Sequence, residues 1–317
     1  MPKYKVLLTD YAWPDVDIER DVLAAVDAEL VVADSTAPSR LAELAQGVDA
    51  IMTCWAQTTA EVIQAAKSCR IVARMGIGLD NIDVAYCTQR GIPVTNVPDY
   101  CVVEVAEHAL ALLFALARNV AEFHRSSKQG HYELADAPTL RRVEGSTLGI
   151  VGYGRIGRCL AEKAHRLGIK LLVCTRTPPD PLPDVRCASL NELLSASDFV
   201  SLHLPLYSET EHLIGARQFA LMPRTSYLIN TSRGGLVDHS ALAAVLANDR
   251  LAGAALDVQE PEPPPLDEPP FRDPRVIVTP HAGFVSDHSV AELRRRAANQ
   301  VATCLAGGVP ENVVNGG

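Results

Sequence analysis

Short apolar runs alternate with stretches of helical periodicity along most of the chain. In the first hundred residues we expect strands at 5–9, 30–33, 50–53, 71–73 and 93–96. In the second half we expect strands at 147–151, 170–174, 199–202, 226–230, 254–257 and 276–278. Strands that alternate with helices are typical of parallel sheets covered on both faces, so the pattern predicts two doubly wound α/β domains.

Three further segments break this alternation. Residues 102–120 are apolar almost all the way round a helix, which predicts a helix that is buried on every side, bridges two domains and packs against a second subunit. Residues 122–143 are polar and irregular, and we expect no regular structure there. Residues 261–274 are rich in proline, which has no N–H donor and a fixed φ, so they are expected to form a loop. A last helix is expected at 286–304, after which 310–314 would return the chain to the first domain.

The length and composition agree with two soluble domains. A chain of 317 residues exceeds the roughly 250–300 residues at which a single core stops growing. We therefore expect a substrate domain made of 1–99 plus 287–317, and a dinucleotide-binding domain at 100–286. The formal net charge of −9 opposes a broad basic face, so nucleic acid is not expected as a partner.

The cysteines and the first residues of the chain indicate the cellular compartment of the protein. The eight cysteines lack the paired spacing of a metal site, so we expect reduced thiols and no bound metal. The first residues lack the apolar stretch of a signal peptide, and no run of about 18 uncharged apolar residues occurs. These features predict a cytoplasmic protein without membrane contact.

A glycine-rich loop carries the clearest chemical signal. Gly152-Tyr153-Gly154-Arg155-Ile156-Gly157 directly follows the strand expected at 147–151 and opens a helical pattern. In such a loop the first glycine permits a tight turn, the second lets a pyrophosphate approach the backbone, and the third lets helix and strand pack closely. The helix N-terminus then faces the phosphates. All six residues are predicted to bind a dinucleotide.

The next strand ends at the position that usually selects between NAD and NADP. An acidic residue there binds the ribose hydroxyls of NAD. Here the strand 170–174 ends in Thr175 and Arg176. A guanidinium forms charge-assisted bonds to a 2′-phosphate, and no carboxylate repels it. We therefore predict NADP as the cofactor, with NAD as the alternative.

Several motifs together resemble one family across essentially the whole chain. They are the stretches 76–83 (GIGLDNID), 96–98 (NVP), 152–157 (GYGRIG), 230–235 (NTSRGG), 256–258 (LDV) and 280–283 (PHAG). They resemble the D-isomer-specific 2-hydroxyacid dehydrogenases, which include glyoxylate/hydroxypyruvate reductases and the related C-terminal-binding proteins. The resemblance implies a flavodoxin-like substrate domain, a Rossmann domain, an active site in the cleft between them, and a homodimer.

The same resemblance assigns three catalytic residues. Arg233 matches the family's substrate-binding arginine, Glu262 its acidic partner and His281 its acid/base residue. A planar guanidinium can bind the carboxylate of a 2-oxo acid bidentately and polarise the neighbouring carbonyl. Hydride delivery leaves a developing alkoxide, for which histidine is the most suitable proton donor near neutral pH. Glu260 competes with Glu262 on spacing alone, and only the family pattern favours Glu262.

Other residues are expected to complete the site. Cofactor contacts are expected from His203, Pro205, Thr231, Ser232, Asp257 and Gly283. Asp257 matches the family residue near the nicotinamide carboxamide, with a structural strand-end aspartate as the alternative. Substrate contacts are expected from the backbone of Ile77 and Gly78, whose amides can face an anion, and from the side chains of Trp55 and Met75. Trp55 can equally be a core residue, and His108 is interpreted as a core histidine.

Taken together, these features predict an oxidoreductase that transfers a hydride between a nicotinamide cofactor and a small 2-oxo acid or D-2-hydroxyacid, such as glyoxylate or hydroxypyruvate. Two alternatives are a cofactor-sensing regulator resembling the C-terminal-binding proteins, and an enzyme of the broader family that oxidises another acid. The complete set of Arg233, Glu262 and His281 favours the enzyme, because a sensor has no need of it. Formate dehydrogenases have glutamine at the position of Glu262, so the glutamate favours the hydroxyacid branch.

Overall fold

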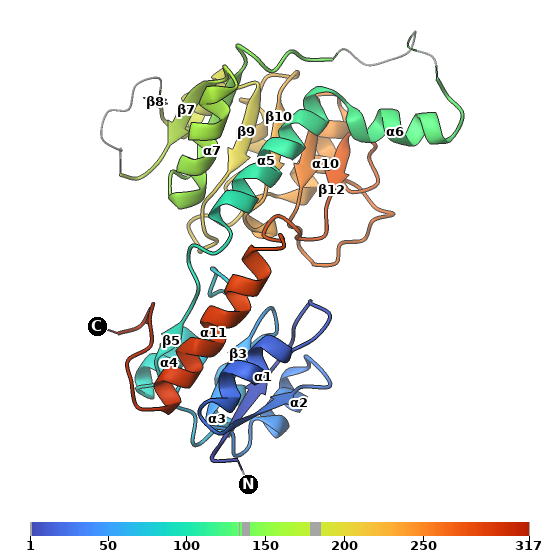
Figure 1. Ribbon diagram of the computed structural model, residues 1–317. Helices are drawn as coiled ribbons and strands as arrows, with labels where there is room; N and C mark the ends of the chain where they lie inside the picture. Colours follow the sequence, from blue (N-terminus) through green and yellow to red (C-terminus); the bar gives the residue numbers. More distant parts are fainter. Residues whose placement is uncertain (1, 133, 135–139, 178–184, 317) are drawn as a thin grey trace. The chain divides into compact units, whose positions relative to one another are not determined.

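The protein folds into two compact α/β units. The computed structural model describes residues 2–132, 134, 140–177 and 185–316. One unit comprises Met1–Tyr100 with Ser286–Gly317, and the other comprises Cys101–Val285. Each contains one parallel sheet with helices on both faces (Figure 1). The predicted class of two doubly wound domains is confirmed.

The first unit is built on a five-stranded parallel sheet with the order β2-β1-β3-β4-β5. This order is the flavodoxin-like one, as the family resemblance implies. The strands are β1 (Tyr4–Leu8), β2 (Ala28–Val32), β3 (Ala50–Thr53), β4 (Val72–Arg74) and β5 (Val94–Thr95). The helices are α1 (Asp17–Ala24), α2 (Pro38–Leu44), α3 (Ala60–Ala65), α4 (Val84–Gln89) and α11 (Ser289–Leu305).

Two layers of helices cover this sheet. Alternate strand residues such as Leu7, Ile51 and Val72 are fully buried in a core shared with α2, α3 and α4. Helices α1 and α11 pack against each other although they lie at opposite ends of the sequence, and α11 also contacts β3 and β4. The end of the chain returns to the sheet edge, where Val313 pairs with Thr95, as predicted for 310–314.

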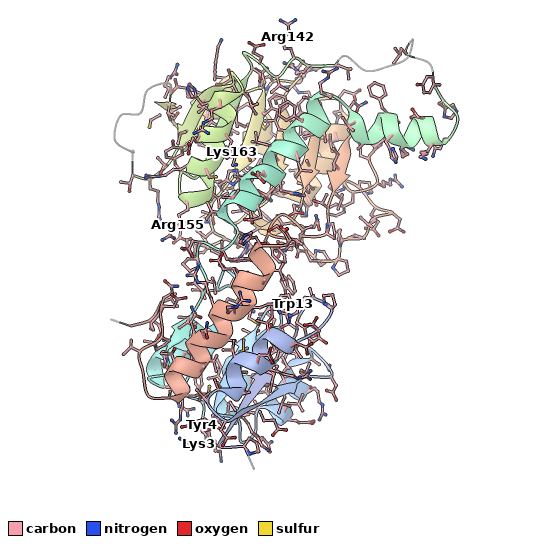
Figure 2. All side chains as sticks on the ribbon, viewed as in Figure 1. Lys3, Tyr4, Trp13, Arg142, Arg155 and Lys163 are labelled. Carbon is pink, nitrogen blue, oxygen red and sulfur yellow. The ribbon has the colours of Figure 1, made fainter. Side chains whose placement is uncertain are left out.

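A buried ion pair joins α1 to α11. Glu19 is fully buried, and its carboxylate accepts bonds from Arg294 Nε at 2.9 Å and Nη2 at 2.8 Å. The guanidinium also lies 5.4 Å from the ring of Trp13, which Figure 2 labels. Removing Arg294 would leave the carboxylate of Glu19 buried without this cation, which is far more costly than removing an exposed pair.

The second unit is built on a seven-stranded parallel sheet with the order β12-β11-β10-β9-β6-β7-β8. Its strands are β6 (Thr147–Val151), β7 (Lys170–Cys174), β8 (Val185–Cys187), β9 (Phe199–Leu202), β10 (Tyr227–Asn230), β11 (Gly253–Leu256) and β12 (Val276–Val278). Its helices are α5 (Val102–Ala117), α6 (Val120–Lys128), α7 (Arg155–Arg166), α8 (Leu190–Ala196), α9 (Ala216–Phe219) and α10 (His239–Ala247), with the 3₁₀ turn η1 (Gly234–Leu236). From β6 the chain first adds β7 and β8 on one side of the sheet, and then adds β9 to β12 on the other side. The change of direction creates a switch point between β6 and β9.

The apolar helix α5 is only partly covered within this unit. It packs on α7 and the sheet, and Glu107 of α5 forms a 2.8 Å ion pair with Lys163 of α7, labelled in Figure 2. However, Val103 is 49% exposed and Phe114 is 37% exposed. Within this unit the sheet and α7 therefore cover only part of α5, and the predicted packing of this helix against a second subunit stays a prediction.

Two local elements were not predicted. Residues 120–128 form α6 instead of irregular structure, and Glu122 stabilises it through bonds to Arg125 and Ser126 one turn away. Asn119 separates α6 from α5 with a left-handed φ of 52°. The short edge strand β8 was also missed, whereas the predicted loop at 261–274 is confirmed. Across the described ranges, no helix combines the length and apolarity needed to cross a membrane.

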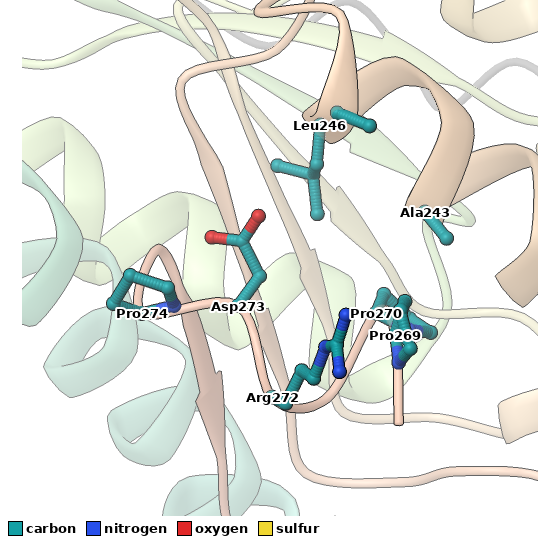
Figure 3. Close-up of a pocket in the computed structure, with 8 residues that line it drawn as sticks. Ala243, Leu246, Pro269, Pro270, Arg272, Asp273 and Pro274 are labelled. Atoms are coloured by element: carbon teal, nitrogen blue, oxygen red, sulfur yellow. The ribbon is translucent and has the colours of Figure 1, made fainter. Parts of the chain in front are cut away.

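A cavity of about 420 Å³ lies beside the end of α10 (Figure 3). Leu246, Pro270 and Asp273 are among the residues that line it. Asp273 and Pro274 precede β12, so the cavity lies at the amino end of that strand. Ligands of parallel α/β sheets bind at the opposite, carboxyl ends, and this cavity is therefore not the candidate active site.

Candidate active site

The three predicted catalytic residues follow three neighbouring parallel strands. Arg233 follows β10, Glu262 follows β11 and His281 follows β12, and these strands are adjacent in the sheet. Carboxyl ends of adjacent parallel strands lie at the same edge of a sheet. The topology therefore gathers side chains that are up to 48 residues apart in the sequence, from position 233 to position 281.

His281 and Glu262 form a direct pair. His281 Nδ1 lies 3.0 Å from Glu262 Oε2, and Glu262 Oε1 accepts a 2.9 Å bond from the backbone N–H of Gln259. Of the two candidate glutamates, Glu262 is the one whose contact with the imidazole is observed. His281 has a left-handed φ of 51°, which is uncommon for a residue with a side chain and often marks a functional position.

The charge state of Glu262 decides the tautomer of His281. Burial, the largest influence, would raise the pKa of Glu262, but the hydrogen bond and charge of His281, the Gln259 amide and the charge of Arg233 together lower it. An ionised carboxylate can only accept a hydrogen bond, so Nδ1 of His281 carries a proton. Nε2 is therefore the ring nitrogen of His281 that is not engaged with Glu262.

Arg233 lies on a turn that packs against the loop carrying Glu262. Asn230 at the end of β10 donates a 2.7 Å bond to the carbonyl of Arg233, and Arg233 Nη1 donates to the carbonyl of Ser232 at 2.7 Å. A Cβ added to Gly234 would lie 2.2 Å from the Gln259 backbone, so only glycine allows this approach. The guanidinium consequently lies close enough to Glu262 to lower its pKa.

Asp257 connects β11 to the loop that carries His281. Its carboxylate accepts bonds from Thr279 Oγ1 at 2.5 Å and from the amides of Ala282 at 2.9 Å and Gly283 at 2.8 Å. His108 Nε2 lies 3.3 Å from the same carboxylate. Burial, the largest influence, would raise the pKa of Asp257, but these four groups lower it to about 2. The carboxylate is ionised near neutral pH and 2% exposed, and its predicted contact with the cofactor remains a prediction.

The glycine loop has the shape that a pyrophosphate requires. Gly152 turns the chain after β6 with a φ of +96°. Gly157 packs so closely that an added Cβ would lie 2.3 Å from the carbonyl oxygen of Gly152, whereas a Cβ on Gly154 would meet no described atom within 4 Å. The open space before Gly154 and the N-terminus of α7, where Figure 2 labels Arg155, suit an anion.

Two buried polar atoms near this loop point to a polar ligand. His203 Nδ1 and Thr231 Oγ1 lack a hydrogen-bond partner among the described residues. His203 follows β9 and Thr231 follows β10, so both atoms belong to the carboxyl edge of the sheet. Burial lowers the pKa of His203 to about 4, and its Nε2 lies 2.8 Å from Ser201 Oγ. Since buried polar groups are normally paired, the residues present fit a dinucleotide that supplies the missing partners.

The remaining predicted cofactor residues occupy the same edge. Thr175 and Arg176 follow β7, Arg176 is exposed, and Thr175 Oγ1 donates to the carbonyl of Thr177 at 3.2 Å. Ser232 Oγ donates to the carbonyl of Leu202 at 2.7 Å, which ties β10 to β9. Pro205 lies in the loop after β9, and its carbonyl accepts a 2.9 Å bond from Thr210 Oγ1.

The predicted substrate residues lie in the first unit, after β3 and β4. The carbonyls of Gly76 and Ile77 accept bonds from Val97 N at 3.0 Å and from Asn96 Nδ2 at 2.8 Å. These bonds fix the Gly76-Ile77-Gly78 backbone. Met75 is 1% exposed, which limits its side chain to a wall or core position, and Trp55 is partly exposed.

Two residues in or near the candidate sites make contacts that were not predicted. Asp10, after β1, accepts the amides of Cys54 at 3.0 Å and Trp55 at 2.7 Å and so shapes the turn after β3. His108 was interpreted as a satisfied core histidine, and its imidazole does have polar partners in Asp257 and Thr279. A polar residue in an otherwise apolar helix was the available signal for His108, and a charged residue directly after a strand was the signal for Asp10.

A sheet that offers a dinucleotide site at its switch point and a proton-exchanging pair three strands away is characteristic of the nicotinamide-dependent oxidoreductases. Comparison with known proteins specifies the group. The family model "D-isomer specific 2-hydroxyacid dehydrogenase, NAD binding domain" matches residues 110–283. A glyoxylate reductase of Korarchaeum cryptofilum is 42% identical over 262 residues, which cover 81% of this chain and 79% of that protein.

Two solved structures share the fold over nearly the whole chain. D-Lactate dehydrogenase from Aquifex aeolicus, complexed with NAD and lactic acid, has a TM-score of 0.89 and 26% identity, covering 99% of both chains. An acyclic imino acid reductase (Bsp5) in complex with NADPH and D-Arg has a TM-score of 0.86 and 26% identity, covering 98% of this chain and 99% of that chain. The chain belongs to the D-isomer-specific 2-hydroxyacid dehydrogenase family, as its motifs predicted, and it is an NAD(P)-dependent oxidoreductase.

The glycine loop allows two alanine variants to be compared. Gly152→Ala places a Cβ 2.2 Å from the carbonyl oxygen of His203 at a positive φ, so we expect it to lower the free energy of unfolding by about 2–3 kcal/mol. Gly154→Ala adds a Cβ to open space, so the unfolding free energy should stay within about 0.5 kcal/mol of that of the wild-type protein. That Cβ should still weaken binding of the nicotinamide dinucleotide at least tenfold. Urea unfolding and fluorescence titration measure both effects, and wild-type affinity in Gly154→Ala would contradict the phosphate site.

Proposed function

We propose that the protein reduces a small 2-oxo acid, such as glyoxylate or hydroxypyruvate, with NADPH, and that Arg233, Glu262 and His281 are its catalytic residues. The observation that carries the proposal is the 3.0 Å pair of His281 and Glu262 at a strand end beside the Arg233 turn. The name of the Korarchaeum relative, a glyoxylate reductase, supports this substrate class.

Each side chain then has a distinct task. When bound, the nicotinamide cofactor supplies the hydride to the carbonyl carbon. Arg233 binds the substrate carboxylate through two N–H groups and polarises the adjacent carbonyl. His281 donates the proton on Nε2 to the developing alkoxide, while Glu262 accepts from Nδ1–H and stabilises the charged imidazole. In the oxidation of a D-2-hydroxyacid, neutral Nε2 takes the hydroxyl proton.

The loop after β4 in the first unit offers backbone donors for an acidic group. We include the amides of Ile77 and Gly78 in the proposal, because hydrogen bonds to the carbonyls of Gly76 and Ile77 fix the backbone of their loop. Consecutive amides of this kind form a small anion-binding concavity. Trp55 and Met75 are proposed to limit the size of the substrate side chain.

A substrate panel tests the reaction directly. NADPH or NADH absorbance at 340 nm is followed with glyoxylate, hydroxypyruvate, pyruvate and formate as separate substrates. We expect the fastest oxidation of NADPH with glyoxylate or hydroxypyruvate. Lack of turnover with every 2-oxo acid would contradict the proposed function, and activity only with formate and NAD⁺ would assign another reaction of the broader family.

The preference for NADPH has its own test. Thr175→Asp combined with Arg176→Ala introduces a carboxylate and removes the guanidinium, so we expect the ratio of kcat/KM for NADPH to that for NADH to fall about 100-fold. Arg217→Ala removes an exposed arginine from α9 and serves as the control. An unchanged ratio in the double variant would contradict the role of Thr175 and Arg176 in phosphate binding.

We also propose that the protein is a homodimer. Val103, Phe114 and Val120 expose apolar surface on α5 and α6, which a second copy would cover. Light scattering during size-exclusion chromatography measures the mass, and a monomer at micromolar concentration would contradict this part of the proposal. A cytoplasmic location stays a prediction, which cell fractionation can check.

A further inference from the structure

His108 connects the apolar helix α5 to the loop that carries His281. Its Nε2 lies 3.3 Å from Asp257 Oδ1 and 3.2 Å from Thr279 Oγ1. The imidazole is 23% exposed, whereas the carboxylate of Asp257 is 2% exposed. The largely buried imidazole of His108 thus contacts Asp257 and Thr279. Asp257 binds the backbone of the loop after β12, and Thr279 is the first residue of that loop.

The hydrogen bonds around His108 define its tautomer. Thr279 Oγ1 donates its proton to Asp257 Oδ1 at 2.5 Å, so it accepts from other groups. The ionised carboxylate of Asp257 also only accepts. Nε2 of His108 must therefore carry a proton, which is shared between the two oxygen atoms. His108 is therefore the hydrogen-bond donor to both oxygen atoms.

Asp257 connects His108 to the loop after β12 through hydrogen bonds. Its carboxylate binds the amides of Ala282 and Gly283, and its backbone carbonyl accepts a 2.8 Å bond from the amide of His281. A Cβ on Gly283 would lie 2.8 Å from Asp257 Oδ2 and 3.3 Å from His108 Cδ2, so glycine permits this close contact. Three consecutive residues, 281–283, are thereby bound to one aspartate.

The backbone of His281 needs such support. A φ of 51° is unfavourable for a residue with a Cβ, and it persists only where the surroundings determine it. We propose that His108 is a positioning residue of the active site: by holding the carboxylate of Asp257 and the hydroxyl of Thr279, it keeps the 279–283 loop in the conformation that directs His281 at the substrate. This inference rests on the proposed function.

Two variants of His108 separate the hydrogen bond from the packing. His108→Met fills a similar volume without a donor, and His108→Gln places an N–H donor near the position of Nε2. For His108→Met we expect kcat to fall about tenfold or more, the KM of the 2-oxo acid to stay within about twofold, and the solvent deuterium isotope effect on kcat to increase, because proton transfer becomes slower. His108→Gln should keep kcat within about threefold of wild type.

Hydrogen exchange gives a readout that does not require turnover. The amides of residues 281–283 should exchange about tenfold faster in His108→Met and near the wild-type rate in His108→Gln, while the amides of β6 stay unchanged. His124→Met makes the same substitution at an exposed position on α6 and should leave both kcat and exchange unchanged. If His108→Met does not fold, His108→Asn replaces it, because its short amide mimics Nδ1 and leaves the contact with Asp257 unmade.

The outcomes distinguish this inference from the proposed function. Wild-type protein without 2-oxo acid reduction would overturn the function. In an active wild-type protein, unchanged exchange or unchanged kcat in His108→Met would overturn the positioning role, as would equal loss of kcat in His108→Met and His108→Gln. Faster exchange with a lower kcat in His108→Met, rescued in His108→Gln, would support it.

Discussion

Replacing His281 with glutamine is expected to lower kcat by about 10²–10⁴-fold, the usual contribution of a positioned general acid. Glutamine keeps polarity and approximate size, but it cannot exchange a proton near neutral pH. The binding of NADPH should remain within about twofold of wild type, because the glycine loop follows β6 whereas His281 follows β12. Steady-state kinetics and fluorescence titration measure the two quantities.

A matched control sharpens this test. His288→Gln makes the same substitution at an exposed position and should leave kcat unchanged. A His281→Gln enzyme with a wild-type kcat would remove His281 from the mechanism.

Replacing Arg233 with lysine is expected to lower kcat/KM by about 10²–10³-fold although the charge is retained. A lysine ammonium is a single point charge and cannot bind a carboxylate and polarise a carbonyl through a planar pair of donors. Each charge-assisted bond contributes roughly 1.5–3 kcal/mol, so the loss of one or two of them accounts for this range. The effect should appear in both KM and kcat, since the guanidinium acts on bound substrate and on the reacting carbonyl.

Structural damage is distinguished from lost chemistry by two comparisons. Arg224→Lys changes an exposed arginine in the turn before β10 and should keep wild-type kinetics. The thermal midpoint of Arg233→Lys should stay close to that of wild type, because the backbone of the turn is held by Asn230 and by the contact of Gly234 with Gln259. Wild-type kcat/KM in Arg233→Lys would mean that another group binds the substrate carboxylate.

The elements of the two sheets were predictable because their signals are local. Alternating apolar runs identified nearly all strands, and the Gly152–Gly157 loop was predicted from a turn, a close approach and a helix start within six residues. The two elements that were missed also depend on local signals, but these signals are weak. Helix α6 depends on side-chain pairs such as Glu122 with Arg125, and β8 is a three-residue edge strand with two exposed members.

By itself, the sequence determined the fold class, the dinucleotide loop and the residue types of the site, because each depends on the conformation of a short segment or on a motif. Only the tertiary structure decided which side chains meet. The spacing of residues in the sequence did not distinguish Glu260 from Glu262 as the partner of His281. The packing of neighbouring strand ends brings Glu262 into contact with His281. His108 meets Thr279 across 171 residues, and Arg294 meets Glu19 across 275. Such contacts depend on which surfaces are buried together, and no local pattern of residues encodes that.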